Sequence, residues 1–213
     1  MAGCCDPRGC DRVFDDRFAR RTAARYRKRG LDRTARRMVD VLTRTGVQGA
    51  TVLEIGGGVG EIQLELLKRG AASATNLELS PAYEAEAAAL IEEAGLAGRV
   101  HRRLVDIATD PAAVPAADIV ILHRVVCCYP EPSALLGVAA DHTRRQLVFS
   151  HPPRNVVSRT VVATQNLLLR LSGREFRTFA HPPAAMLEVL AEHGLRTAVV
   201  HRSPVWHVAA ATR

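Results

Sequence analysis

The segment VLEIGGGVGE, residues 52–61, places two carboxylates around a run of glycines. A short apolar run ends at Ile55, and Gly56, Gly58 and Gly60 then lead into a helical pattern. Glycine permits positive φ and lets a ligand approach the backbone closely, so this turn is typical of nucleotide-binding folds. Several folds share it, and the residues around the glycines must select among them.

The acids of this segment argue against a phosphate ligand. Glu61 stands where the dinucleotide fingerprint needs Gly or Ala, and its charge would repel a pyrophosphate. Glu54 stands two residues before the first glycine, where a carboxylate gives a phosphate ligand no favourable interaction. A Walker-type loop is excluded because no Gly-Lys-Ser/Thr follows. A nicotinamide oxidoreductase is therefore disfavoured, and a positively charged ligand is favoured.

Two further acids stand at the ends of expected strands. Glu78 follows Gly56 by 22 residues, and a carboxylate there can accept both hydroxyls of a ribose. Asp106 can accept a hydrogen bond from an adenine amino group while Ile107 packs against the ring. Because parallel strands end at one edge of a sheet, we expect Glu54, Glu78 and Asp106 to converge on a cationic nucleoside.

Strands that alternate with helices must position these acids. We expect two helices across residues 11–45, with a break at Gly30. The expected strands are 51–55, 73–79, 99–105, 117–123, 146–150, 195–201 and 205–211. The expected helices between them are 60–69, 80–95, 132–143, 155–171 and 182–194. This order predicts an α/β fold with a doubly wound, mostly parallel seven-stranded sheet and an N-terminal helical arm.

The net charge of +7 is concentrated at the N-terminus of the 213-residue chain. Residues 1–50 contain 13 Lys+Arg and 6 Asp+Glu, and the rest of the chain contains 16 of each. We therefore divide the chain into a basic helical arm, residues 1–46, and a ligand-binding domain, residues 47–213. The arm is either a solvated helical face or a contact for an acidic substrate or nucleic acid phosphates.

No run of about 18 uncharged apolar residues occurs, so we expect neither a membrane span nor a membrane partner. The start, MAGCCDPRGCDR, lacks the apolar core of a secretory signal, and we expect a cytoplasmic location. Five cysteines, an odd number, are typical of reduced thiols. Because Cys4, Cys5 and Cys10 lack the Cys-x-x-Cys spacing, we expect no metal site.

The acids and their surroundings resemble the class I S-adenosylmethionine (SAM) dependent methyltransferases. The matching segments are EIGGGVG at 54–60, Glu78, Val105-Asp106 and His123-Arg124-Val125-Val126, the last in the place of the family's fourth motif. The resemblance covers residues 35–213. Within the class, RYRKRGLDRTARRMVDVL and ILHRVVCCYP resemble actinobacterial proteins grouped with magnesium-protoporphyrin O-methyltransferase. At Gly57 many members have a larger residue or cysteine.

The resemblance implies SAM as the cofactor and a Rossmann-like methyltransferase fold across residues 47–213. SAM carries an ammonium and a sulfonium, which nearby carboxylates favour. The implied cofactor-binding residues are Glu54, Gly56, Gly57, Gly58, Gly60, Glu78, Leu79, Asp106, Ile107, His123 and Arg124.

Methyl transfer needs alignment, and a general base where the acceptor must lose a proton. The candidates are His151, His123 and Tyr26. Imidazole titrates near neutrality, and His151, at the end of strand five, is the preferred base because His123 borders the cofactor by its place in the family. Tyr26 lies on the arm, which can close over the cofactor. The competing interpretation for each is an ordinary packed side chain.

The expected acceptor is a small molecule that is methylated on oxygen, bound between the arm and residues 154–180. His151-Pro152-Pro153 is similar to the Asn/Asp-Pro-Pro-Tyr signature of amino-group methyltransferases, but that signature belongs after strand four. The alternatives are an RNA methyltransferase that uses the basic arm and a non-catalytic SAM-binding regulatory protein. No pattern in the sequence indicates an oligomeric state.

Overall fold

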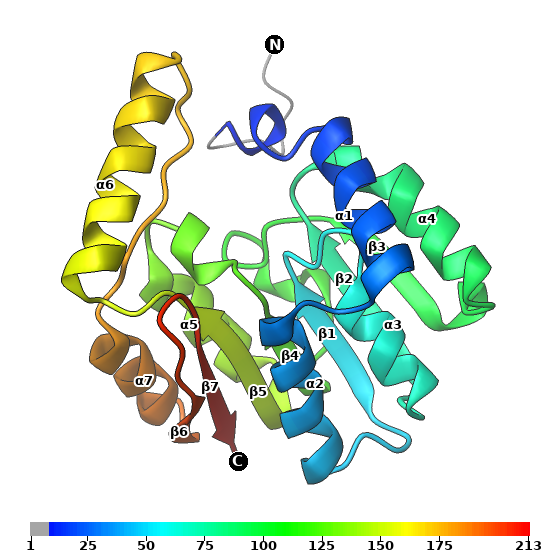
Figure 1. Cartoon of the computed structure of the whole chain (residues 1–213). Coiled ribbons are helices and arrows are strands. Elements are labelled where there is room, and N and C mark those ends of the chain that lie inside the picture. The colour runs from blue at the N-terminus through cyan, green and yellow to red at the C-terminus, as the bar shows by residue number, and fades with distance from the viewer. Residues whose placement is uncertain (1–8) are drawn as a thin grey trace.

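The computed structural model describes residues 9–213 and contains a seven-stranded sheet of order β3-β2-β1-β4-β5-β7-β6 (Figure 1). The strands are β1 Thr51–Ile55, β2 Ser73–Glu78, β3 Val100–Leu104, β4 Ala117–Leu122, β5 Thr143–His151, β6 Arg196–His201 and β7 His207–Thr212. Strands β1 to β5 are parallel, and β7 lies antiparallel between β5 and β6. The predicted doubly wound, mostly parallel sheet is confirmed.

Seven α-helices accompany the sheet within the described residues. They are α1 Asp16–Arg29, α2 Arg33–Thr45, α3 Glu61–Lys68, α4 Glu84–Glu93, α5 Pro132–Asp141, α6 Val156–Leu171 and α7 Pro183–Glu192. The predicted break between the first two is confirmed at Gly30, whose φ of 66° favours glycine. Asp32 then caps α2 by accepting from the backbone N–H groups of Thr34 and Ala35 at 2.8 and 2.9 Å.

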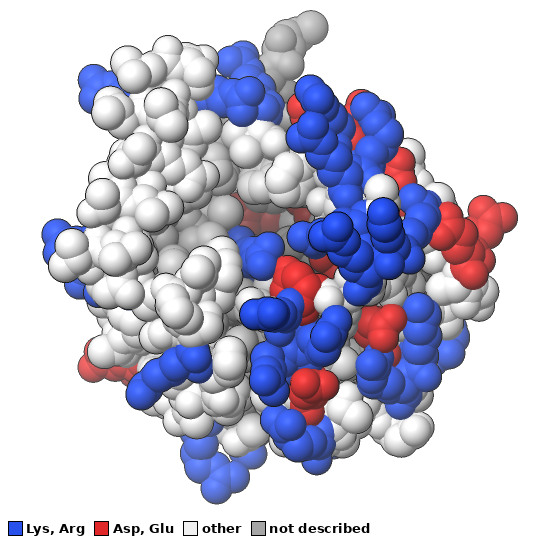
Figure 2. Space-filling model, viewed as in Figure 1, with Lys and Arg blue, Asp and Glu red and all other residues white. Residues whose placement is uncertain are grey.

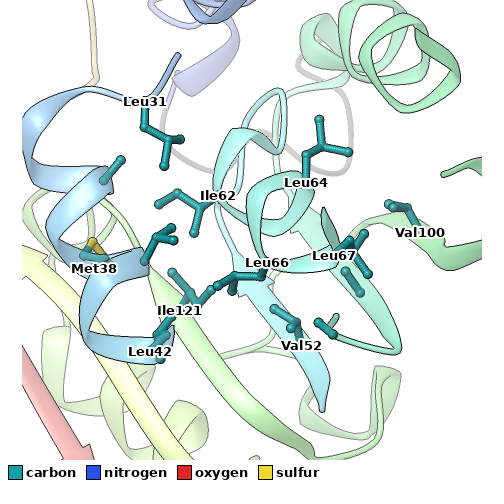
Figure 3. Packing of buried hydrophobic residues seen from close by; sticks show 14 of the residues in the cluster. Leu31, Met38, Leu42, Val52, Ile62, Leu64, Leu66, Leu67, Val100 and Ile121 are labelled. Atoms are coloured by element: carbon teal, nitrogen blue, oxygen red, sulfur yellow. The ribbon is translucent and has the colours of Figure 1, made fainter. Parts of the chain in front are cut away.

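One face of the sheet packs against α1 to α4, and Figure 3 shows this cluster. Side chains alternate across the strands, so Val52 and Ile121 face this cluster while Leu53 and Leu122 face the opposite one. The helical residues labelled in Figure 3 are Met38, Leu42, Ile62, Leu64, Leu66 and Leu67, and Leu31 lies between α1 and α2. The segment before β1 is thus part of the core.

The opposite face packs against α5 and α7, through residues such as Leu136 and Leu190. Helix α6 covers neither face: it has no buried residue, and six large apolar side chains on it are exposed. Figure 1 shows it standing beside the body of the molecule, next to the segment that leads to α7. No helix of the described chain is long and apolar enough to cross a bilayer.

Several element boundaries differ from the sequence expectation by a few residues, and two of these differences have a clear physical reason. Strand β5 begins at Thr143 instead of residue 146, because the exposed Arg144 and Arg145 hide the start of a strand in an apolar pattern. The helix expected from Ser80 begins as a 3-10 turn, Pro81–Tyr83 (η2), before α4. Ser80 accepts from the backbone N–H of Ala82, as the expected cap.

Candidate functional site

The turn between β1 and α3 is built from glycines for two physical reasons. Gly56, Gly58 and Gly60 have φ of 62°, 54° and 83°, which disfavours any side chain there. Gly57 has an ordinary φ, but a Cβ on it would lie 2.9 Å from Cγ of Glu54 and would overlap the Asn76 amide. The loop therefore packs closely on β1 and β2. On its outer side, the backbone atoms of the glycines stay accessible.

A pocket lies over this turn at the carboxyl edge of the sheet. Its volume is about 1220 Å³ including the part open to solvent, which accommodates a nucleoside and a small second molecule. The lining residues from the sheet side include Glu54, Ile55, Gly56, Gly57, Gly58, Glu61, Leu77, Glu78, Leu79, Val105, Asp106, Ile107, His123 and Arg124. Four carboxylates thus border one cavity, and three come from the ends of adjacent strands.

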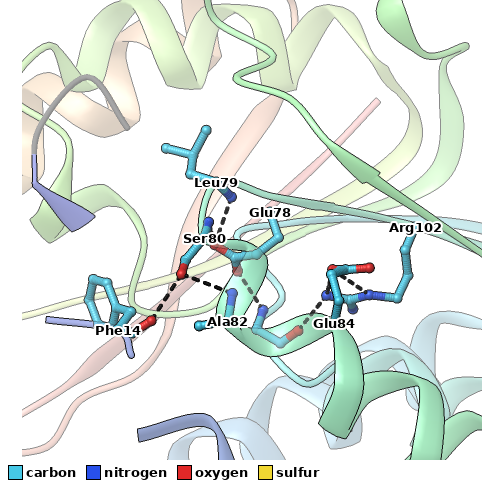
Figure 4. Close-up of polar contacts among 8 residues, drawn as sticks. Phe14, Glu78, Leu79, Ser80, Ala82, Glu84 and Arg102 are labelled. Carbon is cyan, nitrogen blue, oxygen red and sulfur yellow. Dashed lines mark hydrogen bonds and ion pairs between the residues drawn. The ribbon is translucent and has the colours of Figure 1, made fainter. Parts of the chain in front are cut away.

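Glu78 binds the backbone around it through both oxygens (Figure 4). Its Oε2 accepts from N–H of Gly58 at 2.8 Å, and its Oε1 accepts from N–H of Leu79 and Ser80 at 2.7 and 3.2 Å. A carboxylate oxygen has two lone-pair sites, so Oε2 retains one acceptor position toward the pocket. Burial raises the pKa of Glu78 in spite of these bonds.

Glu54 is fully buried beneath the glycine turn and accepts from N–H of Gln63 at 3.1 Å. Burial, and then the charge of Glu61, raise the pKa of Glu54 to about 8. Glu61 begins α3 and also has a pKa raised by burial, with Nη2 of Arg25 at 3.6 Å. A cation in the pocket would therefore stabilise the ionised form of both carboxyl groups.

Asp106 lies in the loop after β3 and lines the pocket, with β2 between its strand and the strand of Glu54. Its carboxylate accepts from N–H of Ala108 at 3.1 Å and from the hydroxyl of Tyr129 at 3.1 Å. Ile107 beside it is buried and lines the pocket. The structure thus brings together Glu54, Glu78 and Asp106, as the sequence predicts.

His123 and Arg124 follow β4 and form a polar cluster at the pocket wall. Nη2 of Arg124 lies 2.8 Å from Oδ2 of Asp32, and Nε2 of His123 lies 3.6 Å from the same atom. Nδ1 of His123 lies 3.1 Å from Oγ of Ser150, which also accepts from N–H of Arg124. Arg124 has a φ of 60°, the only positive value on a non-glycine residue within 9–213, so the surrounding bonds hold a strained backbone.

The other two catalytic candidates lie away from the pocket. His151 is buried, its Nδ1 lies 3.0 Å from the carbonyl oxygen of Pro152, and its ring packs between Phe149 and His207. It does not line the pocket, and burial lowers its pKa. The sequence prefers His151 over His123 because the family position assigns His123 to the cofactor, and this says nothing of the direction of the His151 side chain.

Tyr26 also lies outside the pocket lining. Its hydroxyl donates to Oε1 of Glu65 at 2.8 Å and accepts from Nζ of Lys68 at 3.2 Å. Burial and the bond to Glu65 raise the pKa of Tyr26 above its ordinary value. These contacts dock α1 on α3, which matches the packing interpretation rather than a catalytic one.

The N-terminal arm forms one wall of the pocket, and the sequence did not indicate which of its residues do so. Phe18, Thr22 and Arg25 line it from α1, and Cys10 and Phe14 line it from the turn before α1. The spacing of Phe18, Thr22 and Arg25 places them on one helical face, and this periodicity is the signal that could have revealed them.

Residues 154–180 do not line the pocket in the structure, although the sequence predicts a role in acceptor binding. The segment supports the arm instead: Phe176 is buried, and its ring meets that of Phe14 with centroids 5.3 Å apart. Ser80 holds Phe14 from the other side by donating to its carbonyl oxygen at 2.9 Å (Figure 4).

Cationic side chains gather on the outer surface of α1 and α2 (Figure 2). Arg17, Arg20 and Arg21 are exposed and belong to none of the ion pairs among the side chains that the structure describes. In the same view the surface over α6 is largely uncharged. Cys4 and Cys5 lie outside the described residues, and among residues 9–213 no three His, Cys, Asp or Glu side chains converge on a point that could hold a metal ion.

Residues 53–146 match the family model described as a methyltransferase domain. This range contains the glycine turn, Glu78, Asp106 and His123. No curated protein matches the chain by sequence.

Solved methyltransferase structures share the fold. Magnesium protoporphyrin IX methyltransferase from Synechocystis PCC 6803 with bound SAH is 23% identical, with a TM-score of 0.67 over 84% of this chain and 81% of that one. The O-methyltransferase family 2 protein from Planctomyces limnophilus DSM 3776, complexed with apigenin, is 21% identical, with a TM-score of 0.67 over 92% of this chain and 61% of that one. Human N-acetylserotonin methyltransferase in complex with SAM is 17% identical, with a TM-score of 0.64 over 93% of this chain and 55% of that one.

Proposed function

We propose that this chain transfers a methyl group from SAM to an oxygen atom of a small organic acceptor. The observation that carries the proposal is the set of four carboxylates, Glu54, Glu61, Glu78 and Asp106, around one pocket over an open glycine turn. A ligand with an ammonium, a sulfonium, a ribose and an adenine has a positive charge or a hydrogen-bond donor for each of these carboxylates, whereas a pyrophosphate would be repelled by them.

Each acid has a separate part to bind. Glu54 and Glu61, at the glycine turn, would face the charged amino-acid part of SAM. Glu78 has one free acceptor position for a ribose hydroxyl, and Asp106 would accept from the adenine amino group beside Ile107. SAM supplies an electrophilic methyl group on its sulfonium, and these residues fix its direction toward the acceptor.

The acceptor would lie under the arm, where the lining is apolar and aromatic. Phe14 meets Phe18 edge to face at 5.5 Å, and Phe18 meets Tyr83 at 6.4 Å. Such a wall favours an apolar, flat molecule over a highly charged one. Solved neighbours bind apigenin or are named for protoporphyrin and N-acetylserotonin, and the sequence lacks the amino-group signature, which together support oxygen as the acceptor atom.

His123 is the base candidate that the geometry favours, because it lines the pocket and His151 does not. Both its ring nitrogens already have neighbours, Ser150 at 3.1 Å and Asp32 at 3.6 Å. The contact with Asp32 is the longer one, so Nε2 would exchange it for an acceptor hydroxyl. The ionised Asp32 would then stabilise the protonated imidazole.

Two finer expectations belong to this proposal. We divide the chain into a basic helical arm, residues 1–46, that roofs the acceptor side, and a SAM-binding domain, residues 47–213. The pocket contacts of Phe14 and Phe18 support this division. The likeness to actinobacterial proteins grouped with magnesium-protoporphyrin O-methyltransferase rests on residues 25–42 and 121–130 and stays a prediction.

A metabolite screen with methyl-deuterated SAM tests the proposal. We expect a small molecule to gain one labelled methyl group with the wild-type chain and not with a Glu54→Gln, Glu78→Ala double variant. His123→Gln should lower the rate far more than His151→Gln when the acceptor is a neutral phenol or carboxylic acid. A product labelled on nitrogen would refute the oxygen assignment, and SAM binding without turnover across the screen would favour a regulatory SAM-binding protein.

The second candidate is an RNA methyltransferase, which the exposed Arg17, Arg20 and Arg21 favour. Binding through phosphate contacts would weaken steeply with salt. A filter-binding titration with total tRNA at two ionic strengths separates the two candidates. Tight, salt-sensitive binding that is lost in the triple Arg→Gln variant would favour RNA over a small molecule.

A further inference from the structure

Cys127 and Cys128 are adjacent in the 3-10 turn Val126–Cys128 (η5), yet their thiols lie together. The two Sγ atoms are 3.7 Å apart and lie 3.4 and 3.5 Å from the carbonyl oxygen of Arg124. Neighbouring residues on a helical turn ordinarily point in different directions. This turn instead presents two sulfur atoms on one side.

Backbone hydrogen bonds hold the turn in this shape. The N–H of Cys128 donates to the carbonyl oxygen of Val125 at 2.8 Å, and the carbonyl oxygen of Cys127 accepts from N–H of Phe179 at 2.7 Å. A ligand that bridges both sulfur atoms would therefore find them already ordered, which lowers the entropic cost of binding.

The pocket gives access to the pair through Cys128. Cys128 lines the pocket, and Cys127 is buried with its Sγ 3.7 Å from that of Cys128. The hydrogen bond from Cys128 and the charge of Arg124 lower the pKa of Cys127, whereas the same bond and burial raise the pKa of Cys128. Of the two thiols, Cys127 is therefore the one that ionises first, and the thiolate is the form that binds soft atoms.

Other roles for the pair fit less well. A structural zinc site needs about four ligands, and the described residues offer no group of three. A disulfide would require the sulfur atoms to close from 3.7 Å to about 2.05 Å, which the hydrogen-bonded turn opposes. An atom that bridges the two sulfurs leaves them near their present separation.

We propose that Cys127 and Cys128 form a dithiol site that chelates a monosubstituted trivalent arsenical, R–As(OH)₂, at the wall of the pocket. Two As–S bonds form and two As–O bonds break. The two thiol protons leave with the hydroxyl groups as two molecules of water. Arsenic stays trivalent, so no oxidant or reductant takes part. The site depends on the thiol geometry and not on the proposed methyl transfer.

Phenylarsine oxide is the probe, and intact-mass spectrometry is the readout. The chain used carries Cys4→Ser and Cys5→Ser, because that second adjacent pair would also react. We expect one phenylarsenic group per folded chain. It should survive excess 2-mercaptoethanol and leave with 2,3-dimercaptopropanol, since only a dithiol competes with a chelate. A folded chain that takes up no group overturns the proposal, whatever the variants show.

Three further substitutions locate the site. Cys127→Ser and Cys128→Ser should each reduce the adduct that survives 2-mercaptoethanol at least about tenfold, because one sulfur gives no chelate. Cys10→Ser, which removes another pocket thiol, should leave it unchanged. Circular dichroism confirms that each variant is folded. An adduct retained in Cys128→Ser, or lost in Cys10→Ser, would contradict the assignment.

Discussion

Replacing Glu54 with glutamine changes one oxygen of a fully buried carboxyl to an amide and should change how SAM affinity depends on pH. The remaining oxygen can still accept from N–H of Gln63, so the local fold has no reason to change. Burial and Glu61 raise the pKa of Glu54 to about 8 in the ligand-free chain. Under the proposed function, SAM, a cation, would bind the ionised form of Glu54, so a proton would leave when it binds.

The size of the effect follows from the fraction of Glu54 that is ionised. With a pKa of about 8, that fraction rises about ninefold between about pH 6 and about pH 7, and SAM affinity should rise with it. The α-amino group of SAM stays mostly protonated over this range, since such groups titrate near about 7.7–8.0. Any second proton released by Glu61 or Glu78 would steepen the slope.

Isothermal titration calorimetry in two buffers of different ionisation enthalpy measures both the affinity and the protons released. We expect about one proton released per SAM bound at about pH 6.5 in the wild-type chain, and a weaker, nearly pH-independent binding in Glu54→Gln. Wild-type affinity that does not change with pH, or the same slope in both chains, would refute the reasoning.

The same raised pKa fixes the sign of a stability effect. The unfolded chain releases the Glu54 proton near pH 4.5, before the folded chain does near pH 8. The contribution of Glu54 to the free energy of unfolding is therefore complete below pH 4.5 and is lost as the pH rises through about 8. Urea unfolding of the ligand-free chain should show this fall in the wild type and a smaller one in Glu54→Gln.

Further variants test the remaining contacts. Glu78→Ala should weaken SAH binding by about 1–3 kcal/mol, because it removes a charged hydrogen-bond acceptor, whereas the exposed Asp110→Ala should not; equal effects in calorimetry would count against the ribose assignment. Asp32→Ala should lower the free energy of unfolding by about 1–2 kcal/mol. This loss should exceed that of Asp15→Ala, which removes one exposed cap bond. Equal losses in urea unfolding would show that the ion pair between Asp32 and Arg124 contributes nothing to stability. Gly57→Ala should lower the free energy of unfolding by about 1–3 kcal/mol and weaken SAH binding, because the added Cβ would overlap the Asn76 side chain. Unchanged SAH binding would contradict the close packing of this turn on Asn76.

The cofactor side of the pocket could be predicted because it depends on local and periodic features. Glycines after a buried strand, and acids at successive strand ends, have positions that the parallel sheet fixes. The structure places Glu54, Glu78 and Asp106 around one pocket for this reason. The sequence uses Glu61 only as evidence against NAD binding. In the structure, Glu61 lies at the start of α3 and lines the same pocket.

The acceptor side could not be predicted, because it depends on contacts distant in sequence. Which way a histidine points after a strand depends on its neighbours, and Phe149 and His207 hold His151 outside the pocket. Residues 154–180 are apolar enough to suggest a pocket, yet α6 leaves its apolar side chains exposed, and the segment after it contacts Phe14 and the carbonyl oxygen of Cys127. Asp32 caps α2 through bonds to residues beside it in sequence, whereas its contact with Arg124 depends on the tertiary structure.

A competition titration with SAM, SAH and NAD⁺ tests the central claim most directly. Acids that surround an open glycine turn should bind one SAM or SAH per chain, with SAM favoured for its additional positive charge, and should not bind NAD⁺, whose pyrophosphate meets Glu61. Stoichiometric binding of NAD⁺ at this pocket, or no binding of SAM or SAH by the folded chain, would contradict the claim.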